Sequence, residues 1–89
     1  MRSVMTVIGK DTVGILAKVS AVCSERNVNI SEVSQTVMQE LFCMIMMCDI
    51  SGINVEFDSF VDEMSALGDK SNLKIHVMHE NIFNAMHTI

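Results

Sequence analysis

The residues best placed to do chemistry lie near the start of the chain, in the segment GKDTVG between Gly9 and Gly14. A strand-like stretch ends at Gly9 and a helical pattern begins at Thr12, so the segment forms the corner between them. Amides in the first turn of a helix lack partners within it, which makes such a corner a site for a carboxylate. Gly14 would let a ligand approach the backbone, and Asp11 is well placed to cap the helix. A tight turn with simple capping is the alternative interpretation.

The sequence lacks the residue patterns that phosphate-binding enzymes and metal sites need. An enzyme that grips phosphate there would need an arginine, whereas GKDTVG has none and Asp11 would repel the substrate. No Ser, Cys or Lys has an activating partner at a recognisable spacing. A metal site is disfavoured because His76 and His79 would point to opposite faces of a strand and Cys43 and Cys48 differ in parity. We therefore expect no enzyme activity, no metal and no cofactor.

Composition points to a partner surface. The chain has 89 residues, of which 49% are hydrophobic. A chain of this size has a thin core that cannot hide so much hydrocarbon alone, so we expect a homo-oligomer, either a dimer or a higher oligomer. The formal net charge is −5 with only six Lys and Arg residues. That balance argues against nucleic acid and against an anionic membrane as the main partner.

Three features predict a cytoplasmic protein. No apolar run approaches the roughly 20 residues that a membrane-spanning helix needs. The start of the chain, MRSVMTVIGK, has no signal-peptide core with a small-residue cleavage site. The cysteines are an odd set without a C-x-x-C pair, which fits reduced thiols; they are Cys23, Cys43 and Cys48.

The first third of the chain predicts a strand and then a helix. Residues 2–8 are apolar at both parities, as in a central strand that is covered on both faces. We expect a helix over residues 12–26, with Asp11 at its N-cap and Asn27 in the left-handed conformation that ends it. Its apolar stripe consists of Ile15, Leu16, Val19, Val22 and Cys23.

The middle of the chain predicts a hairpin. Residues 27–39 begin like a strand, but the apolar parity slips between Ile30 and Val33, which indicates a bulge. The polar pair Gln39-Glu40 marks the turn. Residues 41–50 are almost wholly apolar and predict a second central strand.

A second helix and a last strand follow. We expect Asn54 to cap the helix and Gly68 to stop it. Residues 73–79 alternate between apolar and polar types, as in an edge strand with one wet face. The helix face that should be buried consists of Phe57, Phe60, Val61, Met64 and Leu67.

The order strand, helix, strand, strand, helix, strand predicts one α+β domain over residues 1–89. The compact solution with right-handed crossovers is the ferredoxin-like βαββαβ sandwich, an antiparallel sheet ordered 4-1-3-2 with both helices on one face. A short helical tail over residues 81–89 carries Ile82, Phe83, Met86 and Ile89 on one side. Because the central strands are apolar on both faces, the second face of the sheet needs cover from a partner or from this tail.

The segment GKDTVGILAKVSAVCSERNVNI resembles the opening of an ACT domain. It has an acidic residue at the turn, Gly three positions on, an aliphatic pair, a helix and then Asn-Ile at the next strand. The stretches ISEVSQT, FCMIMM, FDSF and HENIFNAMHTI extend the resemblance, over essentially the whole chain, to small stand-alone ACT-domain proteins of bacteria and archaea.

The resemblance implies a regulatory module that pairs through its sheets and binds an amino acid between domains. The residues that it assigns to the ligand site are Gly9, Lys10, Asp11 and Gly14 in the turn, Ile15 and Leu16 behind it, and Asn29 and Ile30 across the interface. The ligand's carboxylate would meet helix amides, and its ammonium would meet Asp11 or Asn29.

A fused enzyme or DNA-binding domain usually receives the signal of an ACT domain. We therefore expect a separate partner, a metabolic enzyme or a regulator, to receive it here. The competing hypothesis is a protein-interaction or assembly module without a small ligand.

Overall fold

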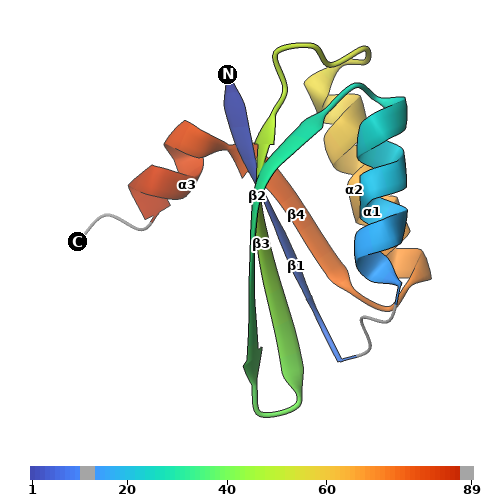
Figure 1. The fold of residues 1–89 in the computed structure, drawn as a ribbon, viewed down its shortest axis with the longest axis vertical. Helices are drawn as coiled ribbons and strands as arrows, with labels where there is room; N and C mark the ends of the chain where they lie inside the picture. Colours follow the sequence, from blue (N-terminus) through green and yellow to red (C-terminus); the bar gives the residue numbers. More distant parts are fainter. Residues whose placement is uncertain (11–13, 87–89) are drawn as a thin grey trace.

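The computed structural model describes residues 1–10 and 14–86 of the chain. The predicted order of elements is confirmed, followed by a third helix (Figure 1). The elements are β1 (Arg2–Gly9), α1 (Ile15–Glu25), β2 (Asn29–Met38), β3 (Leu41–Asp49), α2 (Phe57–Lys70), β4 (Lys74–His79) and α3 (Glu80–Met86).

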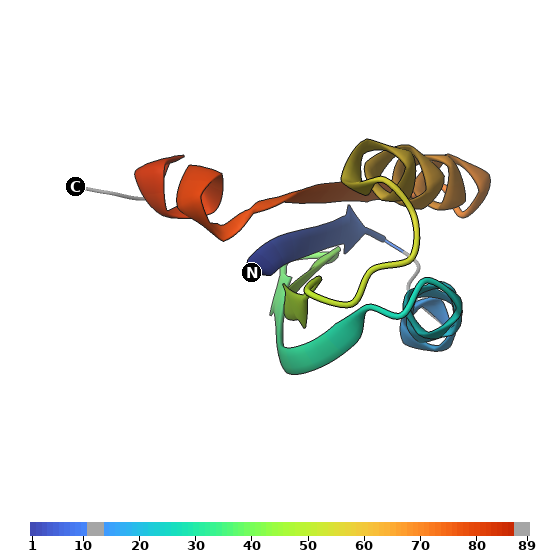
Figure 2. The same ribbon diagram turned by 90° about the horizontal axis from the view of Figure 1, so that it is seen from above.

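The four strands form one sheet in the order β2-β3-β1-β4, and each neighbouring pair is antiparallel. This is the predicted ferredoxin-like order 4-1-3-2, counted from the other edge. Seen from above, α1 and α2 lie on one face of the sheet and α3 projects on the other side (Figure 2). The neighbours Val4 and Met5 in β1 are both fully buried, although they point to opposite faces. At this point β1 is covered on both faces, as its sequence predicts, whereas Thr6 and Ile8 farther along the second face are only half-buried.

Helix α1 begins later than its sequence pattern predicts. It starts at Ile15, and Gly14, not Asp11, occupies the N-cap position. Asp11 itself lies outside the described residues. The predicted apolar stripe of this helix is only partly buried, because Ile15 is 3% exposed in the core whereas Leu16 is 40% exposed. Asn27 has φ 59°, which confirms the predicted left-handed residue after the helix.

Two predictions for α2 are wrong. Asn54 does not cap the helix, whose N-cap is Glu56; the Asn54 side chain donates instead to the carbonyl of Glu25, 3.0 Å away, at the end of α1. Gly68 does not stop the helix, which continues to Lys70. A Cβ at Gly68 would stand 2.9 Å from the carbonyl oxygen of Leu73, so this glycine lets the helix pack closely on the chain entering β4.

The hairpin follows its sequence closely. The register of β2 against β3 shifts between Ile30 and Glu32, where the bulge is predicted. The turn falls at Gln39-Glu40, and Gln39 has φ 58°. In β4, the alternation is also confirmed, because Ile75 is buried and His76 is exposed.

The core lies between the sheet and the two long helices. Its largest fully buried side chains are Phe60, Met5, Met44, Met46 and Met64, so methionine fills much of the space. Within residues 1–10 and 14–86, no helix combines the length and the apolar character that crossing a membrane requires.

Candidate functional site

The predicted ligand corner begins at the end of β1. Gly9 and Lys10 border a pocket of about 360 Å³ that also involves Asp69, Asn72 and Lys74. Lys10 is exposed, so its ammonium group is available to an anion. The described part of the corner therefore combines a small pocket with two cationic side chains and one carboxylate.

The start of α1 lies open to a ligand. Gly14 has φ 75° and ψ 0°, a left-handed conformation that favours glycine. A Cβ built on Gly14 would meet no atom of the described residues within 4 Å. The first turn of α1 has no acidic residue, and no side chain of the described residues caps it. Uncapped first-turn amides are the groups that bind a carboxylate at the start of a helix.

Strand β2, whose first two residues are Asn29 and Ile30, begins at the opposite end of α1 (Figure 1). The helix has 11 residues, which at about 1.5 Å per residue separates its ends by roughly 16 Å. Asn29 is exposed, and Ile30 is half-buried against the core. Both border a second pocket of about 380 Å³, whose other lining residues are Ser20, Cys23, Ser24, Asn27 and Val28.

One chain therefore does not bring the predicted site residues together. Gly9, Lys10 and Gly14 lie toward one end of α1, and Asn29 and Ile30 lie at the other. No single amino acid spans that gap, so a site that uses both groups needs two copies of the chain. The sequence already indicates this separation, because the predicted helix lies between the two groups and the resemblance puts Asn29 and Ile30 across the interface.

A thiol pair lies beside the second pocket. Cys23 of α1 and Cys48 of β3 are both buried, and their side chains are hydrogen-bonded to each other. The bond from Cys48 lowers the pKa of Cys23, whereas the contact with Cys23 and burial raise the pKa of Cys48. Cys43 is half-buried and lies on the other face of the sheet. It is therefore the cysteine most accessible to a reagent.

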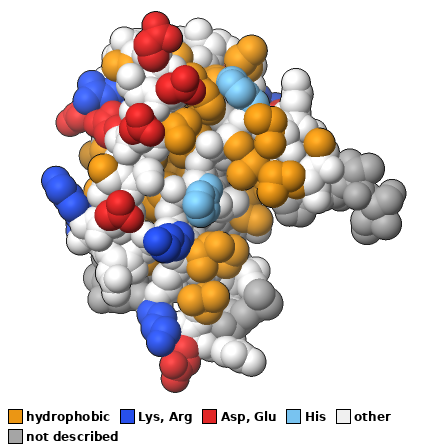
Figure 3. Space-filling view, turned by 180° about the vertical axis from the view of Figure 1, so that it is seen from behind, with side chains coloured by type: hydrophobic (Ala, Val, Ile, Leu, Met, Phe, Trp, Pro, Cys, Tyr) orange, Lys and Arg blue, Asp and Glu red, His pale blue; other side chains and the backbone are white. Residues whose placement is uncertain are grey.

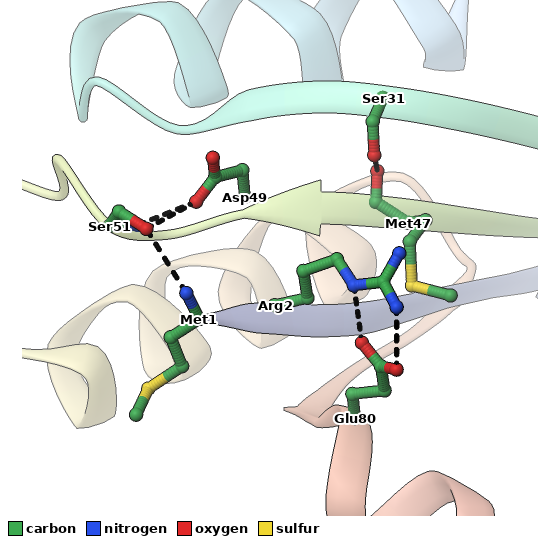
Figure 4. A network of polar contacts seen from close by, with 7 residues as sticks. All are labelled: Met1, Arg2, Ser31, Met47, Asp49, Ser51 and Glu80. Atoms are coloured by element: carbon green, nitrogen blue, oxygen red, sulfur yellow. Dashed lines mark hydrogen bonds and ion pairs between the residues drawn. The ribbon is translucent and has the colours of Figure 1, made fainter.

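Polar contacts hold the far end of the sheet together, as Figure 4 shows. The N-terminal ammonium donates to Ser51 Oγ at 3.1 Å, and Ser51 donates to Asp49 through both its amide and its hydroxyl. These two bonds hold the pKa of the Asp49 carboxyl below its usual range. Arg2 and Glu80 form an ion pair at 2.6 Å that ties β1 to the start of α3.

This network was not predicted, and it lies away from the corner. Its members come from the two ends of the chain and from the residues after β3, so no local spacing reveals it. Ser31, the extra residue of the bulge, also donates to the Met47 carbonyl at 3.0 Å. The network therefore has a structural explanation, which leaves the α1 corner as the candidate ligand site.

Comparison with known proteins shows the family. The family model of the ACT domain matches residues 3–67. A UPF0237 protein of Listeria innocua is 54% identical over 89 residues, which is 100% of both chains. A UPF0237 protein of Methanocaldococcus jannaschii is 44% identical over 88 residues, or 99% of this chain and 98% of the relative.

Among solved structures, an ACT domain protein from Streptococcus pneumoniae superposes with a TM-score of 0.81 at 35% sequence identity. The match covers 100% of this chain and 97% of that one. The resemblance seen in the sequence is thus confirmed by sequence and structure over nearly the whole length. The chain belongs to the ACT domain family, whose domains typically bind small ligands and regulate other proteins.

Proposed function

We propose that this chain is a regulatory protein that binds an amino acid between two copies and signals to a separate partner protein. The observation that supports the proposal is the start of α1, where no side chain of the described residues caps the first turn and a Cβ on Gly14 would meet none of their atoms within 4 Å. Family membership supports a regulatory role rather than a catalytic one. The partner would be a metabolic enzyme or a regulator in the cytoplasm.

Pairing along the β2 edge would complete the site. Val33 and Val37 are 41% and 68% exposed, and their register with β3 puts them on the face that carries the helices. Leu16 of α1 is 40% exposed. If two β2 edges meet antiparallel, the second copy is turned end for end, and its Asn29 approaches the Gly14 corner of the first.

The two halves of such a site suit a zwitterion. The ligand's carboxylate would accept hydrogen bonds from amides in the first turn of α1, with Lys10 nearby as a cation. Its ammonium would donate to the side-chain oxygen of Asn29 from the second copy, or to Asp11. Ile30 would contribute apolar surface beside the ligand's side chain. Ligand binding would thereby couple two chains, which gives a partner protein a change to detect.

Calorimetry with a panel of amino acids tests the proposal. We expect heat at micromolar concentrations with one amino acid, at least tenfold weaker binding in Asp11→Ala or Asn29→Ala, and unchanged binding in the controls Asp62→Ala and Asn81→Ala. Both controls remove an exposed side chain of the same type from another element. A panel without heat would contradict ligand binding and favour the assembly module.

A further inference from the structure

Two cysteines from separate elements meet in the core at one end of the molecule. Cys23 lies in the last turn of α1, and Cys48 lies near the end of β3. Both are buried, and their side chains are hydrogen-bonded to each other. The proposed function uses neither thiol, so this pair needs an explanation of its own.

The short connection from α1 to β2 helps to bring the two thiols together. The carbonyl of Cys23 accepts a hydrogen bond from the amide of Val28 at 2.8 Å. Two residues later, Ile30 stands opposite Cys48 in the ladder between β2 and β3. The chain therefore passes from one cysteine to the strand neighbour of the other within a single tight turn.

The loop after β3 makes a second connection to the end of α1. Asn54 donates from its backbone amide to the Arg26 carbonyl at 3.1 Å and from its side chain to the Glu25 carbonyl at 3.0 Å. The Asn27 side chain donates to the Gly52 carbonyl at 2.7 Å. Two independent sets of backbone contacts thus hold the last turn of α1 over the end of β3, where the thiols lie.

The two thiols differ in what can reach them. Cys23 borders the pocket of about 380 Å³ at this end of α1, whereas Cys48 is not among its described lining residues. Only 1% of Cys23 is exposed, so a reagent that reaches it must be small. Hydroxyl and amide side chains form much of the lining, which suits a reagent that hydrogen-bonds as water does; they belong to Ser20, Ser24, Asn27 and Asn29.

We propose that Cys23 and Cys48 form a redox modification site, which hydrogen peroxide converts into a disulfide within one chain. The Cys23 thiolate attacks one oxygen of the peroxide and becomes a sulfenic acid, while the O–O bond breaks and the second oxygen takes up a proton and leaves as water. The Cys48 sulfur then attacks the Cys23 sulfur, and the departing hydroxyl leaves with the Cys48 proton as a second water. Two thiols are oxidised, and one peroxide is reduced to two waters.

The acidity of the two thiols agrees with this order of steps. The hydrogen bond from Cys48 lowers the pKa of Cys23, whereas the contact with Cys23 and burial raise the pKa of Cys48. The thiolate is the form of cysteine that attacks an oxidant. Cys23, which also borders the pocket, is therefore the attacking thiol, and Cys48 is the thiol that completes the disulfide.

The disulfide would join the last turn of α1 to β3, at the end of the molecule where β2 begins with Asn29 and Ile30. This site goes beyond the proposed function, because its formation requires neither an amino acid nor a second copy of the chain. Its test therefore gives the same answer whether or not calorimetry detects a ligand.

The third cysteine has to be removed before the test. Cys43 is half-buried on the other face of the sheet, where it borders a separate pocket with Phe83 and Met86 of α3. Hydrophobic side chains gather beside α3 on that side of the molecule (Figure 3), so a thiol there is open to bonds between chains. Cys43→Ser leaves only the pair in the core.

Thiol counting in the Cys43→Ser protein tests the site without a substitution in the core. Hydrogen peroxide should consume both remaining thiols, lower the mass of the chain by two hydrogen atoms and leave it monomeric on a denaturing gel, and dithiothreitol should restore both thiols. The rate should not depend on protein concentration, because the bond forms within one chain. Two thiols that persist in protein whose circular dichroism shows it to be folded would overturn the inference, as would a disulfide between chains.

Labelling with dimedone, which traps sulfenic acids, tests the order of the two steps. In the Cys43→Ser background, Cys48→Ala should leave Cys23 as a sulfenic acid that dimedone labels after peroxide treatment. Cys23→Ala, the matched control, should leave Cys48 unlabelled. A label on the Cys23→Ala protein and none on the Cys48→Ala protein would overturn the assignment of Cys23 as the attacking thiol.

Discussion

Gly9 lies directly against Leu73: an added Cβ would stand 1.9 Å from the Leu73 Cδ2 atom and 3.2 Å from its Cγ atom. Leu73 is only 4% exposed, so it has little room to move away. The first residue of the candidate corner is therefore fixed by packing between β1 and the chain entering β4. Gly14, in contrast, borders open space and depends on its left-handed backbone.

Gly9→Ala should destabilise the fold by about 1–3 kcal/mol, the usual cost of an extra methyl group in a packed interior. Urea unfolding of the wild type and the variant measures the difference. Combining Gly9→Ala with Leu73→Val, which shortens the opposing side chain, should recover part of the loss. An equal loss in both backgrounds would show that Leu73 is not the obstacle.

Glycine substitutions at the two residues of the β2–β3 turn should change the stability of the fold in opposite directions. Gln39 has φ 58°, which costs a residue with a side chain about 1–2 kcal/mol. Gln39→Gly removes that cost but loses backbone entropy on folding, so we expect a net gain of about 0.5 kcal/mol. Glu40 is not among the described residues with positive φ. Glu40→Gly, measured by the same urea titration, should therefore lose stability.

The fold order could be predicted because the periodicities of its elements are clear. Residues 2–8 and 41–50 are apolar at both parities and became the two central strands, while 73–79 alternates and became an edge. The parity slip after Ile30 located the bulge at the correct residues. Each of these patterns reflects which faces of a strand are buried, and the order of apolar and polar residues in the sequence shows that directly.

The errors fall where tertiary contacts replace local rules. Asn54 has the side chain of a good N-cap, but it bonds to the end of α1 instead. Glycine often ends a helix, but Gly68 lies inside α2, where close packing on the chain entering β4 requires it. The role of Asp11 stays a prediction, because that residue lies outside the described part of the chain. The division of the candidate site between the two ends of α1 agrees with the expectation that Asn29 and Ile30 lie across the interface.

A bidentate ion pair should make the stability of the fold depend on pH. Arg26 donates to both carboxylate oxygens of Glu63, at 2.8 and 3.1 Å, and these bonds lower the pKa of Glu63. A carboxyl whose pKa is lower in the folded state stabilises the fold above its unfolded pKa, about 4.3, and loses that contribution as the pH falls through the folded value.

Wild type should therefore be more stable than Glu63→Gln at neutral pH, and the difference should shrink below about pH 4.3 as Glu63 becomes protonated. Thermal unfolding over a pH series measures both curves. Asp62→Asn serves as the control, since Asp62 is an exposed neighbour on α2. A constant difference between wild type and Glu63→Gln down to strongly acidic pH would contradict a role for the ionised pair.

Ser3 should be a site where a smaller, apolar side chain improves the fold. Its hydroxyl is fully buried and has no hydrogen-bond partner among the described residues, and in the sheet it lies between Cys48 and His79. A buried polar group without a partner costs about 1–3 kcal/mol. Ser3→Ala removes it and leaves only a small gap, so the free energy of unfolding should rise by about 1 kcal/mol in urea. Ser34→Ala, at an exposed position of β2, should change little. A loss of stability in Ser3→Ala would contradict the prediction.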